Sequence, residues 1–193
     1  TGCTTLLASV NAPTALYSVT GNSNAISSNH AISNDGKWIA YTARNPNQTN
    51  GLVLRYNVDS GFTDLAHTNA IMATGTREDL RTLDMTPDGR FIAFLANTET
   101  NVSGATVPSV VVWDGNDGSV TVASRDLAGA VALGAFGLPA SFESPAIDST
   151  GRYVSFVSTA TNLTTNVFDY GLHVYVRDLQ LEQTIMADAD TNG

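Results

Sequence analysis

Three stretches of this chain repeat the same pattern of a tight turn followed by a strand, and this repeat constrains the fold more than any single residue. The copies begin at residues 32–41, 85–94 and 147–156. Their turn glycines, Gly36, Gly89 and Gly151, lie about 53 and about 62 residues apart. Self-similarity at such a period is typical of repeat architectures, in which each repeat is one supersecondary unit. The chain is therefore expected to fold as an array of similar units.

Each copy predicts four short antiparallel strands. The first turn places proline or glycine where turn geometry favours them, because proline presets φ and glycine tolerates a positive φ. The strand after the turn is rich in aromatic and β-branched residues, which favours a strand over a helix. Four antiparallel strands per repeat, arranged radially, form a β-propeller blade. The second strands are expected at 38–41, 91–94 and 153–156, the third at 52–56, 110–113 and 173–176, and the fourth at 62–66, 120–123 and 183–187.

The repeated turn and strand resemble the TolB-like β-propeller repeat family. The shared pattern is a Ser/Thr-x-Asp-Gly-Arg/Lys turn, an aromatic-hydrophobic-Ala-Phe/Tyr strand, and a later strand that ends in Arg-Asp-Leu, as at 177–179. The third copy departs from it, with Asp148 at the Ser position and Thr150 where aspartate is usual. The resemblance implies an all-β propeller that serves as a periplasmic interaction platform. We interpret Asp35 and Asp88 as turn-capping residues, because aspartate in such turns hydrogen-bonds its own backbone.

The whole chain, 1–193, is predicted to be a single partial or half propeller, with repeats at about 26–68, 79–125 and 141–189. Residues 1–7 align with 60–66, which predicts three complete blades plus one extra N-terminal outer strand. Closed propellers typically have four to eight blades, and open ends would expose unpaired strand edges. The chain is therefore expected to be either a piece of a longer propeller or half of a homodimer that completes a six-bladed ring.

The net charge of −9 argues against nucleic acid and anionic membranes as partners, because both would repel such a surface. No stretch approaches the roughly twenty apolar residues of a membrane span, so no membrane insertion is expected. One cysteine, Cys3, excludes an internal disulfide framework. Scarce lysine with abundant Thr, Asn and Ser resembles exported bacterial propellers, which predicts a periplasmic or secreted protein.

Blade geometry places the tight turns on one face and the long loops on the other. The long loops span about 43–51, 97–108 and 158–171 within repeats, and about 67–80 and 125–143 between them. Binding functions concentrate in loops held by a rigid scaffold, so a ligand or partner is expected on this loop-rich face.

Six residues form the predicted ligand-binding set. When the first strands are aligned, Ser28, Arg81 and Glu143 fall at equivalent positions, where they would rim a central channel. The alternative is that Arg81 and Glu143 are merely solvated or form salt bridges between blades. The other three lie in the long loops nearby. The set is Ser28, Asp79, Arg81, Phe142, Glu143 and Tyr170.

The sequence predicts no catalytic residue, no metal site and no cofactor. Its histidines, His30, His67 and His173, are scattered, and no phosphate-binding loop or zinc-spaced Cys/His set is present. We therefore favour a non-enzymatic binding or scaffold module for a protein or glycan partner. Two alternatives stay open, namely the propeller domain of a polysaccharide lyase or of a peptidase-type enzyme, and a structural segment of a large bacterial surface repeat protein.

Overall fold

In the computed structural model, which describes residues 4–72, 82–100, 104, 106–165 and 171–189, strands form three antiparallel sheets of four strands each. Among the residues described, the first and second sheets have one β-pairing of strands between them, that of Ala70 with Ala96. The first sheet holds β1 (Ile26–Ile32), β2 (Trp38–Arg44), β3 (Asn50–Asn57) and β4 (Thr63–Ile71). The second holds β5 (Leu83–Met85), β6 (Phe91–Thr100), β7 (Thr106–Asp114) and β8 (Val120–Val122). The third holds β9 (Phe142–Ile147), β10 (Tyr153–Ser158), β11 (His173–Asp178) and β12 (Gln183–Met186).

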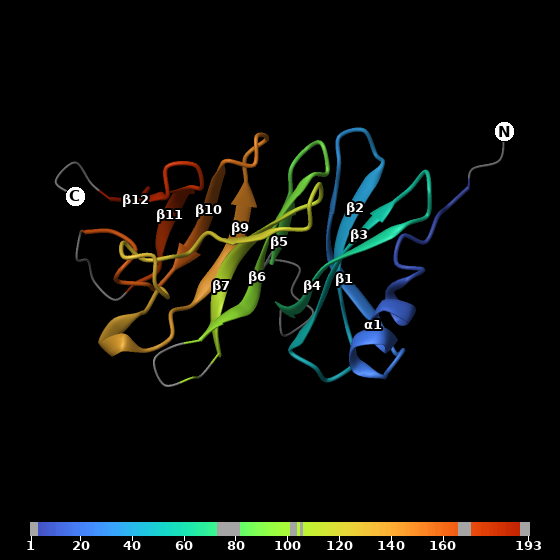
Figure 1. Cartoon of the computed structure of the whole chain (residues 1–193), viewed down its shortest axis with the longest axis horizontal. Coiled ribbons are helices and arrows are strands. Elements are labelled where there is room, and N and C mark those ends of the chain that lie inside the picture. The colour runs from blue at the N-terminus through green and yellow to red at the C-terminus, as the bar shows by residue number, and fades with distance from the viewer. Residues whose placement is uncertain (1–3, 73–81, 101–103, 105, 166–170, 190–193) are drawn as a thin grey trace.

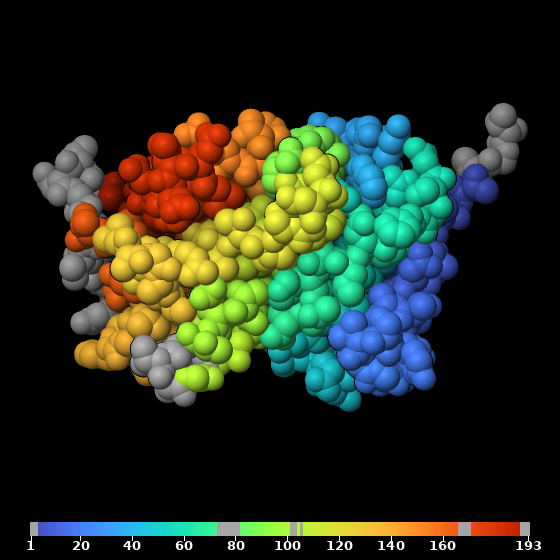
Figure 2. Space-filling model, viewed as in Figure 1, coloured from blue at the N-terminus to red at the C-terminus, as the bar shows by residue number. Residues whose placement is uncertain are grey.

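The three sheets stack face to face in the order of the sequence (Figures 1 and 2). Their first strands, β1, β5 and β9, lie next to one another, as expected when sheets radiate from a common axis. The backbone N–H of Ile147 on β9 donates a 2.9 Å hydrogen bond to Asp84 on β5. The predicted all-β, antiparallel, propeller-like architecture is confirmed, and the blade count of a complete ring stays a prediction.

Successive side chains along a strand point to opposite faces of its sheet. The core between two neighbouring sheets is therefore made of side chains from both of them. Ala40 and Val53 of the first sheet pack with Phe94 and Val111 of the second. The other face of the second sheet packs against the third in the same way, around the fully buried Phe156. The second sheet, which lies between the other two, therefore buries apolar side chains on both of its faces.

The prediction of an extra N-terminal outer strand over residues 1–7 is wrong for residues 4–7, and residues 1–3 lie outside the described residues. Residues 4–7 form no strand, and helix α1 (Ala12–Thr20) follows. Pro13 sits in the first helical turn, where its missing N–H costs nothing, and Gly21 ends the helix in a left-handed conformation. Ala12 and Leu16, one helical turn apart, are buried against the outer face of the first sheet. The i, i+4 spacing of Ala12 and Leu16 indicates a helix here, but the alignment of residues 1–7 with 60–66 favoured a strand at the N-terminus.

The aspartates of the first turns hold the turns together, as predicted. Asp35 accepts hydrogen bonds from the Ser33 hydroxyl at 2.6 Å and from the Lys37 backbone at 3.0 Å. Asp88 makes the equivalent bonds in the second turn. In the third turn Asp148, which stands at the Ser position, has this role and accepts hydrogen bonds from three backbone N–H groups.

Figure 1 shows these turns along one edge of the stack and the β2–β3 loop along the opposite edge. We call these edges the turn edge and the loop edge.

An arginine–aspartate pair recurs on the turn edge. Arg90 binds Asp114 through two hydrogen bonds of 2.9 and 2.6 Å, and Arg152 binds Asp178 in the same way, with the shortest contact at 2.6 Å. Each pair links the residue after a turn glycine to the end of the third strand. These arginines lower the pKa of the carboxyls of both Asp114 and Asp178.

A depressed carboxyl pKa makes the fold sensitive to acid. The paired aspartates stabilise the folded state above the unfolded pKa of about 3.9, and this contribution is lost as the pH falls from there toward the folded pKa. We expect the free energy of unfolding in urea to be lower at pH 3 than at pH 5 and pH 7. Arg152→Gln should reduce this difference, because Asp178 would then titrate closer to its ordinary pKa. An unchanged pH profile in that variant would contradict the assignment.

Candidate functional site

A pocket of about 410 Å³ opens on the loop edge of the first sheet, where α1 ends and the β2–β3 loop begins. None of its lining residues is charged, and most offer an amide or hydroxyl group. We call it the amide pocket. It is lined by Leu16, Thr20, Asn22, Asn45, Pro46, Gln48, Asn50, Gly51, Leu52 and Thr68.

Two asparagines fix the walls of the amide pocket. The buried Asn45 donates from Nδ2 to the backbone carbonyls of Asn22 at 2.9 Å and Asn24 at 2.7 Å, which ties the segment after α1 to the β2–β3 loop. Asn50 donates to Asn69 at 2.9 Å and accepts from Asn97 at 3.3 Å, which joins the first and second sheets. The rim of the pocket is therefore held from three parts of the chain.

Gln48 is an exposed residue that lines the amide pocket. Its side chain is exposed and hydrogen-bonds to no other residue that the structure describes. A glutamine amide both donates and accepts hydrogen bonds. Gln48 can therefore bind a polar ligand without first breaking an internal bond, as can the exposed hydroxyl of Thr68, which also lines the pocket.

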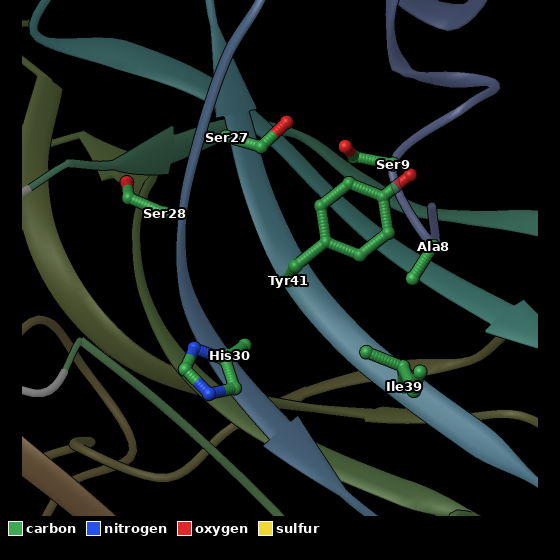
Figure 3. Close-up of a pocket in the computed structure, with 7 residues that line it drawn as sticks. All are labelled: Ala8, Ser9, Ser27, Ser28, His30, Ile39 and Tyr41. Carbon is green, nitrogen blue, oxygen red and sulfur yellow. The ribbon is translucent and has the colours of Figure 1, made fainter. Parts of the chain in front are cut away.

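A second pocket, of about 310 Å³, lies on the same outer face of the first sheet, beneath residues 8–9. Figure 3 shows the hydroxyls of Ser9, Ser27 and Tyr41 on one side of it and His30 with Ile39 on the other. Tyr41 is only 3 % exposed, yet its hydroxyl has no hydrogen-bond partner among the described residues. Burial and the neighbouring Tyr56 raise the pKa of Tyr41 to about 12, so this hydroxyl stays neutral.

An unpaired buried hydroxyl costs stability, because its hydration is lost without replacement. We expect Tyr41→Phe to raise the free energy of unfolding by about 1 kcal/mol, measured by urea denaturation. Tyr175→Phe is the matched control, since the buried Tyr175 hydroxyl donates a 2.9 Å bond to the carbonyl of Ala160. That variant should lose about 1 kcal/mol. A loss of similar size in both variants would show that the Tyr41 hydroxyl is satisfied in solution.

The structure describes three of the six predicted site residues. Ser28 pairs with Thr42 across β1 and β2, and Glu143 pairs with Val157 across β9 and β10, which are equivalent register positions. Ser28 also borders the second pocket, although its hydroxyl lies 3.3 Å from that of Thr42. Phe142 is 6 % exposed and packs against Phe156 in the core. The remaining three, Asp79, Arg81 and Tyr170, lie outside the described residues.

Sequence reasoning missed the amide pocket and Tyr41. The one available signal was the run of Asn, Gln and Thr at 45–50, which identified a loop but not a lined cavity. The pocket exists because α1 closes one of its sides, and this helix was not predicted.

The histidines lie apart in the fold. His30 borders the second pocket, His67 packs against Phe94 with ring centroids 5.3 Å apart, and His173 lies 3.2 Å from Asp188. Burial lowers the pKa of His67. Within the described ranges, His, Cys, Asp and Glu form no cluster of three or more that could hold a metal ion. Among these residues no helix has the length and apolar character needed to cross a membrane.

Comparison with solved structures shows the fold. The chain is similar to the β-propeller domain of the trilobed protease from Pyrococcus furiosus, with 18 % identity, a TM-score of 0.53, and coverage of 84 % of this chain and 41 % of that one. It is also similar to the tricorn protease, with 12 % identity, a TM-score of 0.51, and coverage of 79 % and 14 %. For an acylaminoacyl peptidase from Pyrococcus horikoshii the identity is 14 %, the TM-score 0.51, and the coverage 87 % and 26 %.

The chain thus spans less than half of each of these proteins. No protein-family model and no curated protein sequence matches it. At these identities the likeness establishes a propeller-like fold and leaves activity and partners open.

Proposed function

We propose that this chain is a non-enzymatic binding module, built from TolB-like propeller repeats, that holds a neutral glycan in the amide pocket on its loop edge. The observation that carries the proposal is the uncharged lining of amide and hydroxyl groups. These groups donate and accept hydrogen bonds, as sugar hydroxyls do. The pocket volume also lies within the range of small-ligand sites.

The overall charge supports the same partner class. A net charge of −9 disfavours binding of acidic polysaccharides and nucleic acids, because like charges repel, whereas it does not repel a neutral sugar. We also propose an exported, periplasmic or secreted location, where such glycans are accessible; scarce lysine supports it.

Titration calorimetry with a panel of neutral oligosaccharides tests this function. We expect at least one glucose, mannose or N-acetylglucosamine oligomer to bind, and Gln48→Ala to weaken its binding about fivefold to tenfold, the value of one hydrogen bond. Gln183→Ala, an exposed glutamine on β12 in the third sheet, is the matched control and should bind normally. Absence of binding to the whole panel, or equal affinity in Gln48→Ala, would contradict the proposal.

The structural neighbours favour a second candidate, a propeller domain that accompanies a peptidase. The three similar structures are all named as proteases or peptidases. In that role the loop edge would bind an extended peptide. Binding of unstructured peptides, without binding of oligosaccharides, would select this candidate over the glycan module.

A further inference from the structure

The two interfaces between sheets share one contact on the turn edge. The ring of Trp38, at the start of β2, lies against Gly89 in the turn of the second sheet. The ring of Phe91, at the start of β6, lies against Gly151 in the turn of the third sheet. Any Cβ at either glycine would collide with the ring. Each sheet therefore presents an aromatic ring that fits only a bare Cα of the sheet that follows.

The strands that face the next sheet are also alike in the two interfaces. Ala40 and Val53 of the first sheet and Val110 and Val112 of the second occupy these positions, and all are at most 4 % exposed. We call this side of each sheet its forward face. In both cases the following sheet covers it.

The forward face of the third sheet repeats this pattern, but no described residue covers it. Tyr153, the counterpart of Trp38 and Phe91, is 41 % exposed. Cross-strand pairing puts Val157 beside Val174 and Val176 beside Ile185 on this face. Val174 is 39 % exposed and Ile185 61 % exposed. Figure 1 places this face at the opposite end of the stack from α1.

The opposite end of the stack is closed to such packing. Helix α1 lies on the outer face of the first sheet, where Leu16 packs with Leu52 and Leu54. A second copy that offered its first sheet to the third sheet of its neighbour would have to displace this helix. The complement of the forward face is therefore not the first sheet of another copy.

We propose that the forward face of the third sheet docks a further four-stranded unit of the same repeat type, with a turn glycine seated on the ring of Tyr153. The two existing interfaces define the chemistry of this partner, namely a bare glycine Cα on the turn edge and an apolar, aromatic-centred strand face. That face would cover the exposed Val174 and Ile185 and the half-buried Val157 and Val176, as the third sheet covers Val110 and Val112.

An extended chain tests the proposal, in which a copy of residues 126–189 follows Ala189 of the full chain. Val174→Cys in the original third sheet reports coverage through its rate of thiol labelling, resolved by peptide mass spectrometry. We expect labelling to slow at least tenfold in the extended chain relative to the unextended one. The matched control carries valine in place of glycine at the appended counterpart of Gly151, and its labelling should stay fast.

Equal labelling rates in the two chains would overturn the proposal, provided that slow hydrogen exchange in the appended strands, read by the same mass spectrometry, shows that the appended unit is folded. Light scattering of the unextended Val174→Cys chain gives a second readout. A concentration-dependent dimer in which the introduced thiol is protected from labelling would also overturn the proposal, since the occupant would then be a second copy.

Discussion

Gly89→Ala is expected to destabilise the protein by about 3 kcal/mol, because it combines backbone strain with a steric clash. Gly89 has a φ of +76°, which side chains rarely adopt, and a methyl group there would lie 2.6 Å from the Trp38 ring. The ring is held between two sheets and cannot move aside without opening their interface. Urea denaturation of the variant measures the loss.

Gly118→Ala separates the two causes. Gly118 has nearly the same φ, +75°, but an added methyl group there meets nothing within 4 Å. This variant should therefore lose only the strain, about 1 kcal/mol. Equal losses at the two positions would mean that the Trp38 ring yields, and that the ring–glycine contact does not define how the sheets meet.

Arg55→Met is expected to cost about 3 kcal/mol, because it leaves a carboxylate and two carbonyls without their donor. The guanidinium of Arg55 lies between the rings of Trp38, at 4.0 Å, and Trp113, at 4.6 Å. It binds Asp64 at 2.7 Å and the carbonyl of Gly89 at 2.7 Å, with a longer bond to the carbonyl of Gly115. One side chain thus joins the first two sheets through charge, hydrogen bonds and ring contacts.

A double-mutant cycle with Asp64→Asn tests whether the ion pair carries this effect. The combined variant should lose at least about 1 kcal/mol less than the sum of the single variants, because the carboxylate is no longer left unpaired. Arg90→Met is the comparison, since the Arg90 side chain is 42 % exposed and its pair with Asp114 faces water, and its loss should be much smaller. Additive effects at Arg55 and Asp64 would assign the stabilisation to ring stacking and carbonyl binding instead.

Arg55 also explains why the two inter-sheet interfaces differ. Its register position in the second sheet is taken by Val112, opposite Thr121 where the first sheet has Asp64. A pocket of about 290 Å³ remains between the second and third sheets, lined in part by Phe91, Val112 and Arg152. The first interface is therefore filled by a buried cation, whereas the second relies on apolar packing and keeps this pocket.

The sequence alone determined the strands and tight turns of the three repeats, because both are local properties. Alternating apolar residues predict which strand face is buried, and the Asp-Gly turns set where each strand reverses. It also determined which edge carries the turns, since that follows from strand order.

Only the tertiary structure decided what the strand faces meet. Helix α1 lies where an extra strand was expected, and the amide pocket exists because that helix stands beside the β2–β3 loop. Phe142 became a core residue because the neighbouring sheet covers it. The sandwich of Arg55 between Trp38 and Trp113 joins residues far apart in the chain. Such contacts depend on how whole sheets pack against one another. The repeat pattern of one sequence does not say which residues of different sheets come into contact.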